Sequence, residues 1–401
     1  MNRTAILTAL LPALLLTAAC GAGAGQDADA PVVLGASLSL TGPLGTIGRP
    51  QQAGLERLVA DVNARGGVQV GGVRRELALR VLDNRSEAAA AGQQASELIL
   101  KDSAAALVGG CTPPINTPIA QIAEKNRVPL VTSCFPLGAF RDAAPAGGWT
   151  YAWDFHFEET EQARVLVEAA GLAGAAKKAA LFTDNEVDGV IQRKLFRDAA
   201  VKAGYEIVGD YTFPVGQSDF SSFVNDAKRA GAEVVLGQMI PPDGIALVKQ
   251  MKSLSYTPKV IGIAKAADTA SWLDGLGELA DNTVHNGFWV PDRARPATAA
   301  FLKAMEGRFA DTASLGIAAA AYSVGEVVAD ALARAGSTDP EKLNEAIGAT
   351  KGAFVFAEVA FGPDHTSPTP VTAEQWQDGV TRQVFPAVEG VTLRTPPLGL
   401  E

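Results

Sequence analysis

Short apolar runs alternate with helical segments along the first third of the chain, and this alternation constrains the fold more than any other feature. The runs have the length and the β-branched content of buried strands. They are VVLGASL (32–38), ELALRVL (76–82), AALVG (105–109) and VPLVT (128–132). Because a helical segment follows each of the first three runs, we predict a parallel sheet with helices on both faces.

The helical segments carry their own start and stop signals. The segment after the first run has one apolar face, made by Leu55, Leu58, Val59 and Val62. We expect this helix to begin near Gln51 and to end at Gly66 and Gly67, since glycine accepts the left-handed conformation of a helix end. Thr117 and Pro118 have the signature of a cap and a first turn, which predicts a helix start there.

A second series of strand-like runs begins near residue 150. Its runs are KAALFTD (178–184), EIVGDYTF (206–213), AEVVLGQM (232–239) and KVIGIA (259–264). The pattern breaks at 283–290, and two long helical stretches follow at 297–309 and 314–334 before the β-like pieces FVFAEVAFG and RQVFP. The predicted fold is α/β, with two doubly wound parallel-sheet lobes.

The first twenty residues have the composition of an export signal. Arg3 precedes the apolar run Ala5–Leu16, which is shorter than the roughly 20 residues that span a bilayer core. LTAAC resembles the lipobox of bacterial lipoproteins, with its leucine displaced by one position, so residues 1–19 are expected to be a signal peptide and Cys20 the lipidated first residue. The alternative is plain secretion with an incidental cysteine. Residues 20–30 have the composition of a flexible tether.

The composition of the chain limits the kinds of molecule that it can bind. About 370 residues follow the tether, too many for one ordinary core and suited to two domains. With 34 Lys and Arg against 44 Asp and Glu, the chain lacks the basic surface that nucleic acid requires. Three histidines, at 156, 285 and 365, argue against a His-rich metal site. We expect neither a metal nor a cofactor.

The catalytic motifs of α/β proteins are missing. The sequence has no G-x-S-x-G, no phosphate loop with its lysine and no dinucleotide fingerprint after a strand. The loops at strand ends instead mix Thr, Ser, Asn, Gly and Pro with apolar residues, as in SLSLTGPLGTIG, GGCTPPINTP, TSCFPLG, FTDNEVDG and GQMIPPDG. Such loops are typical of a small-molecule cleft beyond the carboxyl ends of strands, which favours binding over an enzyme.

A set of motifs follows in a fixed order between residues 31 and 390. They are LSLTGPLGTIG, LVADVNARGGV with Asp83 beyond it, ALVGGCT, RVPLVTSC, QSDFSSFVNDAKRAGAEVVL, AAAAYSVGEVVADALARAG and WQDGVTRQVFP. In this order they resemble the substrate-binding proteins of bacterial ABC importers, of the leucine/isoleucine/valine type with the type I periplasmic-binding fold.

The resemblance implies two lobes joined by three crossings of the chain. The implied crossings are near Thr150, Asn286–Val290 and Gly352–Val355. The implied lobes are 31–149 with 291–352 (lobe one) and 150–290 with 353–401 (lobe two).

It also implies a monomer that closes on a small molecule and delivers it to a membrane permease. A lipid on Cys20 would hold the protein at the periplasmic or extracellular face of the cell membrane. The alternatives are a ligand-sensing regulator of the same fold without a permease and, less favoured, an enzyme of unrecognised type.

The two remaining cysteines follow consecutive strands. Cys111 and Cys134 end the third and fourth runs, and neighbouring strands lie about 4.8 Å apart, which suits the usual 4.4–6.8 Å Cα separation of a disulfide. We predict that they are bridged. The alternative is two free thiols near the cleft.

The resemblance implies where a ligand carboxylate is held. In this family a hydroxyl after the third strand and backbone groups after the fourth strand hold it. Thr112 matches the hydroxyl, and Ser133 and Cys134 match the backbone groups. Asn116, at the next helix N-terminus, is expected to add a donor, and Thr41 and Gly42 are expected to line the same cleft.

Several positions depart from the amino-acid binders of the family. Ile47 and Asp188 stand where those relatives carry aromatic residues, and Pro136 replaces a hydroxyl. After KVIGIA, where relatives carry the acid that pairs with the ligand ammonium, this chain has Ala264 and Lys265. Because an unpaired buried ammonium is very unfavourable, we predict a ligand other than an ordinary branched-chain amino acid.

The direction of Lys265 decides between two classes of ligand. If its side chain points inward, a small organic acid fits, with an aromatic one favoured beside Phe135, Phe155, Met239 and Trp289. The alternative is that Lys265 points to solvent, as most lysines do. If Asp188 takes over the pairing, an amino-bearing ligand fits as well.

Overall fold

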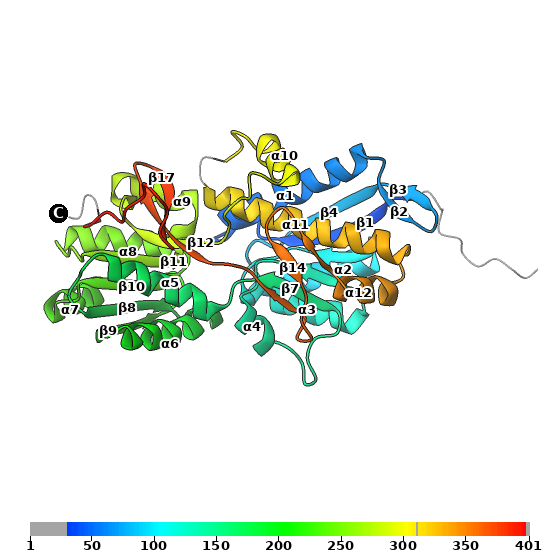
Figure 1. The fold of residues 1–401 in the computed structure, drawn as a ribbon. Helices are drawn as coiled ribbons and strands as arrows, with labels where there is room; N and C mark the ends of the chain where they lie inside the picture. The colour runs from blue at the N-terminus through cyan, green and yellow to red at the C-terminus, as the bar shows by residue number, and fades with distance from the viewer. Residues whose placement is uncertain (1–29, 310–311, 398–401) are drawn as a thin grey trace, which may run out of the picture.

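The computed structural model describes residues 30–309 and 312–397, so the expected signal peptide, Cys20 and almost all of the tether lie outside the described residues. The described chain forms two α/β lobes that lie side by side (Figure 1). Lobe one carries the first strands and the long helix α11, and lobe two carries the middle of the chain and the C-terminal hairpin. The predicted fold class is confirmed.

Lobe one contains a six-stranded sheet in the order β15-β7-β6-β5-β1-β4, with every neighbouring pair parallel. Its strands are β1 (Val32–Leu38), β4 (Leu77–Asp83), β5 (Ala106–Val108), β6 (Leu130–Thr132), β7 (Ala152–His156) and β15 (Thr366–Pro368). Two small hairpins flank the sheet: β2 (Val68–Val70) with β3 (Val73–Arg75), and β13 (Lys351–Ala353) with β14 (Glu358–Ala360).

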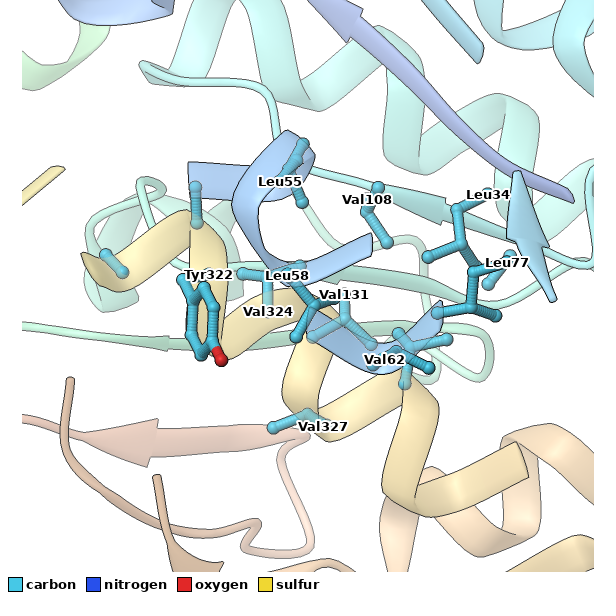
Figure 2. Close-up of a cluster of buried hydrophobic side chains, with 14 of the residues drawn as sticks. Leu34, Leu55, Leu58, Val62, Leu77, Val108, Val131, Tyr322, Val324 and Val327 are labelled. Carbon is cyan, nitrogen blue, oxygen red and sulfur yellow. The ribbon is translucent and has the colours of Figure 1, made fainter. Parts of the chain in front are cut away.

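Helices cover both faces of this sheet. They are α1 (Gly45–Ala64), α2 (Ala88–Leu100), α3 (Pro113–Asn126), α4 (Leu137–Asp142), α10 (Pro296–Ala304), α11 (Thr312–Ala335) and α12 (Pro340–Gly348). Figure 2 shows the core on the α1 and α11 side, where Leu58 and Val62 from α1 lie with Val324 and Val327 from α11 near the strand residue Val131. By length and composition α11 is apolar enough to cross a membrane, but 72% of its most apolar window is buried in the molecule, as expected of a core helix.

Lobe two contains a seven-stranded sheet in the order β17-β16-β12-β11-β10-β8-β9. Its strands are β8 (Lys178–Asp184), β9 (Glu206–Phe213), β10 (Val234–Met239), β11 (Val260–Lys265), β12 (Val284–Gly287), β16 (Thr372–Gln377) and β17 (Val380–Phe385). Strands β8 to β12 are parallel, whereas β16 and β17 add an antiparallel hairpin at one edge. The helices are α5 (Glu159–Leu172), α6 (Val187–Lys202), α7 (Ser221–Ala230), α8 (Pro241–Ser253), α9 (Ala270–Leu276) and the 3-10 turns η1 (Ala266–Asp268) and η2 (Gly277–Ala280).

Two of the three crossings lie later in the chain than the sequence analysis expects. Strand β7 belongs to the sheet of lobe one, so the first crossing follows His156 rather than Thr150. Strand β15 also joins that sheet, so the third crossing follows Pro368 rather than Gly352–Val355. The second crossing follows Gly287, within the expected region. The first and third crossings are joined by a hydrogen bond from the Thr369 N–H to the His156 carbonyl oxygen, 2.7 Å long.

Two helices begin earlier than expected. Helix α1 begins at Gly45 rather than near Gln51. Helix α3 begins at Pro113, and Pro118 lies inside it rather than in its first turn. Pro113 and Pro114 fit the start of a helix because the first N–H groups of a helix have no partner in any case. The second start signal, at Thr117, is therefore overridden by the first.

Candidate ligand-binding site

A cavity of about 100 Å³ lies between the two lobes, at the carboxyl ends of both parallel sheets. Its wall is formed by the loops after β5 and β6 together with α1 and α11 of lobe one, by the crossings, and by residues at the carboxyl ends of β8, β10 and β11 of lobe two. Open parallel sheets bind ligands at this edge. The cavity is therefore the candidate site of ligand binding.

The lobe-one wall presents hydroxyl groups beside a disulfide. Cys111 and Cys134 form the bridge that the sequence predicts, with their Cα atoms 4.7 Å apart. The bridge forms because β5 and β6 are parallel neighbours and both cysteines lie just beyond them. It fixes the flanking residues Thr112 and Ser133, which both line the cavity. The Thr112 N–H donates to the Cys134 carbonyl oxygen at 3.0 Å.

The Thr112 hydroxyl is one of the buried groups of this wall that lack a hydrogen-bond partner within the described residues. The backbone of Thr112 is in the left-handed region, with φ 67°, which is unusual for a β-branched residue. Helix α3 adds few backbone donors, since Pro113 and Pro114 have no N–H and the Ile115 N–H is bonded to the Thr112 carbonyl oxygen.

The wall at the crossings is aromatic. Phe157 and Phe288 stack with ring centroids 4.6 Å apart, and Trp289 donates through Nε1 to the Val355 carbonyl oxygen at 3.2 Å. The imidazole of His156 lies 4.3 Å from the Phe157 ring. Burial lowers the pKa of His156 to about 3, so the imidazole is neutral near pH 7. This part of the wall offers flat apolar surface and no charge.

The lobe-two wall contains a buried ion cluster. The Lys265 ammonium, on a side chain that is 7% exposed, lies 2.6 Å from Glu186 Oε2 and 3.1 Å from Asp188 Oδ2. Burial alone would lower the pKa of Lys265, but the carboxylates of Asp188, Glu186 and Asp184 raise it above its ordinary value. Lys265 therefore points inward and stays charged. Gln238 extends the cluster by donating from Nε2 to Asp188 Oδ2 at 3.0 Å.

Asp184 lies behind this cluster. Burial is the largest influence on its carboxyl, and together with the charges of Asp188 and Glu186 it outweighs the Lys265 ammonium and raises the pKa of Asp184 to about 7. Oxygen atoms of Asp184, Glu186 and Asp188 lie within 4.8 Å of one another, a spacing that suits a shared cation. The Lys265 ammonium already supplies that positive charge from the protein itself.

The structure brings about half of the predicted binding residues together. Those that line the cavity are Ile47, Thr112, Ser133, Cys134, Asp188, Lys265 and Trp289. Thr41 and Gly42 do not: their loop is exposed, and Thr41 Oγ1 donates to Asp83 Oδ2 at 2.6 Å. Their expected place in the cleft is corrected, because Asp83 holds this loop at the outer edge of lobe one.

Four further residues are buried in the lobes rather than exposed to the cavity. Asn116 lies behind the disulfide and donates from Nδ2 to the Cys134 carbonyl oxygen at 3.3 Å. Phe135, Phe155 and Met239 belong to the hydrophobic cores. Each of these three is adjacent in sequence to a residue that does line the cavity. Successive side chains along a strand point to opposite faces. The aromatic surface expected from Phe135 and Phe155 is therefore formed by other residues, such as Phe157 and Phe288.

Several wall residues were not predicted from the sequence. They are Gln51, His156, Phe157, Gln162, Gln238, Asp268, Asn286, Phe288, Phe356 and Glu374, among others. Gln238 lies in the strand-end segment GQMIPPDG, so a polar residue beside Met239 was a usable signal of a binding residue. Phe288 lies in the pattern break at 283–290, whereas Phe157 lies on the first crossing, which no local pattern marks in the sequence.

The sequence is similar to known proteins over most of its length. The family model described as periplasmic binding protein matches residues 31–380. Leu/Ile/Val-binding protein homolog 7 of Brucella abortus (strain 2308) is 25% identical over 401 residues, covering 95% of this chain and 98% of the relative.

Two solved structures have the same fold. A leucine binding protein from Thermotoga maritima superposes with a TM-score of 0.77 at 23% identity, covering 88% of this chain and 97% of its own. A solute binding protein of an ABC transporter from R. palustris, in complex with 4-hydroxybenzoate, superposes with a TM-score of 0.74 at 20% identity, covering 92% and 98%. The chain belongs to the periplasmic binding protein family.

Proposed function

We propose that this receptor captures a small organic acid or an amino-acid-like compound and delivers it to a permease of the branched-chain amino-acid type. The observation that carries the proposal is the buried Thr112 hydroxyl, which has no hydrogen-bond partner in the described part of the chain and lines the inter-lobe cavity opposite the charged wall of lobe two. In this proposal Cys20 carries a lipid that holds the protein, as a monomer, at the outer face of the cell membrane.

The ligand closes the two lobes in this proposal. Thr112 and Ser133 belong to lobe one, whereas Asp188 and Gln238 belong to lobe two. A ligand that contacts both pairs binds well only when the lobes are closed, so it shifts the population toward the closed form. Delivery follows when a permease prefers that form.

The carboxylate of the ligand is placed at the lobe-one hydroxyls. Thr112 and Ser133 are donors without a charge of their own, and the Lys265 ammonium is already engaged by Glu186 and Asp188. The aromatic residues at the crossings then cover the body of the ligand. A solved neighbour of this fold was crystallised with an aromatic acid, which supports this class as one that the fold accommodates.

Replacing Thr112 with valine is expected to weaken ligand binding at least about tenfold, since a hydrogen bond to a charged group contributes about 1.5–3 kcal/mol. The measurement is calorimetric titration with a ligand found by thermal-shift screening of small acids and amino acids. Thr41→Val is the matched control, because Thr41 carries the same side chain outside the cavity. Equal affinity of Thr112→Val and the unmodified protein would rule out Thr112 as an anchor.

Leucine, isoleucine and valine are expected to bind weakly, with dissociation constants above the micromolar range. Their side chains end in methyl groups, which would leave the buried Asp188 Oδ1 atom without a partner. Calorimetric titration of the mature protein with the three amino acids is the measurement, and the screened ligand is the positive control. Micromolar or tighter binding of any of the three contradicts this prediction.

A further inference from the structure

Three buried acceptor atoms in the lobe-two wall have no hydrogen-bond partner within the described part of the chain. They are Asp188 Oδ1, Gln238 Oε1 and Asn286 Oδ1, and each residue is at most 4% exposed. All three residues line the inter-lobe cavity. Buried polar atoms are nearly always hydrogen-bonded in folded proteins, so a cluster of unpartnered acceptors indicates a ligand group that donates.

Contacts with neighbouring residues determine which atom of each side chain remains available. Gln238 uses its amide nitrogen on Asp188 Oδ2 at 3.0 Å, so its carbonyl oxygen is left over. Asn286 uses its amide nitrogen on the Gln162 carbonyl oxygen at 3.3 Å. Asp188 Oδ2 also accepts from the Lys265 ammonium, which leaves Oδ1. The wall therefore presents hydrogen-bond acceptors to the cavity and almost no hydrogen-bond donors.

We propose that this wall is a donor-binding subsite, formed by Asp188 and Gln238, and that the ligand is a small acid whose far end carries a hydroxyl or an amino group. The inference deepens the proposed function and rests on it, because it takes Thr112 and Ser133 as the place of the carboxylate. Asp188 and Gln238 then determine specificity, since they reject acids that end in an apolar group.

Lys265 serves this subsite as a fixed counter-ion. Its ammonium is engaged by Glu186 and Asp188, and its backbone, with φ 65° and ψ −57°, is in a strained region for a long side chain. The Lys265 N–H is held by Asp268 Oδ2 at 2.9 Å. Strain of this kind is retained where the position of a side chain matters.

The charge balance favours an amino group over a hydroxyl. One ammonium is paired with two carboxylates, those of Glu186 and Asp188, so the subsite keeps an excess of negative charge. A hydroxyl and an ammonium group both donate hydrogen bonds. The neutral variant Asp188→Asn distinguishes between them.

The test uses acids of one shape that differ at a single position. The probes are benzoate, 4-methylbenzoate, 4-hydroxybenzoate and 4-(aminomethyl)benzoate, titrated calorimetrically into the mature protein. The hydroxyl and aminomethyl acids are expected to bind at least about tenfold tighter than 4-methylbenzoate, because a site built for a donor rejects the analogue that lacks it.

Variants assign the preference to the subsite. Asp188→Leu should abolish the preference for donor-bearing acids. Asp188→Asn keeps a neutral acceptor, so it should retain the preference for the hydroxyl and lose the advantage of the amino group. Gln238→Leu should weaken the donor-bearing acids alone, and it supplies the same test if Asp188→Leu does not fold. Thr112→Val should weaken every acid equally.

The inference is overturned if 4-methylbenzoate binds as tightly as the donor-bearing acids, if the preference survives both Asp188→Leu and Gln238→Leu, or if none of the four acids binds. Failure of the proposed function gives a different result. If 4-hydroxybenzyl alcohol, which lacks the carboxylate, binds as tightly as 4-hydroxybenzoate, the acid anchor at Thr112 is wrong while the donor subsite stands.

Discussion

Replacing Lys265 with methionine is expected to destabilise lobe two by about 3 kcal/mol or more. The substitution keeps the length of the side chain but leaves the buried Asp188 carboxylate and the half-buried Glu186 carboxylate without their shared ammonium. Removing one partner of a buried ion pair is strongly destabilising, because the remaining charge stays buried and uncompensated. Chemical denaturation monitored by circular dichroism measures the loss.

Two further variants separate this effect from the loss of one positive charge. Lys194→Met removes an ion pair with Asp198 that is exposed, with side chains 75% and 56% accessible, and it should change stability by less than about 1 kcal/mol. Adding Glu186→Gln and Asp188→Asn to Lys265→Met should restore at least half of the lost stability. If Lys265→Met is no more destabilising than Lys194→Met, the cluster does not stabilise the lobe as described.

The strands that the sequence predicts well are those buried on both faces. Such strands are continuous apolar runs, and β1 and β8 begin and end where VVLGASL and KAALFTD predict. Strand β15, by contrast, is the short polar segment Thr366–Pro368, which carries no strand signal of its own. It is a strand because its backbone pairs with β7, a long-range contact that local pattern does not encode. The misplaced third crossing follows from this one missing strand.

The errors in the predicted site have a similar cause. The rule that ligands bind at strand ends singled out the loops that carry Thr112 and Ser133, and the family resemblance pointed to Lys265; all three residues line the cavity. The rule did not say which of two neighbouring residues faces inward. Near the ends of β7 and β10 the expected Phe155 and Met239 are each one position from a residue that does face inward. A shift of one residue along a strand moves a side chain to the opposite face, so the choice depends on a register that the sequence did not reveal.

Removing the Cys111–Cys134 disulfide is expected to destabilise lobe one by about 3 kcal/mol. The bridge closes a loop between residues 23 apart in the sequence, and a cross-link of this length restricts the unfolded chain by about that amount. It should also weaken ligand binding, because Thr112 and Ser133 are held in place by the bridged residues beside them. The measurements are the denaturation midpoint and the affinity of the variant Cys111→Ala/Cys134→Ala.

The single variants make this prediction specific to the bridge. Either Cys111→Ala or Cys134→Ala alone breaks the same covalent link, so each should lose nearly as much stability as the double variant, whereas two independent apolar contacts would give additive losses. Reductant should lower the stability of the unmodified protein and leave the double variant unchanged. Thiol titration of the unfolded, unreduced mature protein gives the direct control. Two reactive thiols besides any at Cys20 would show that the bridge is absent, and would assign Cys111 and Cys134 to the core as small apolar residues.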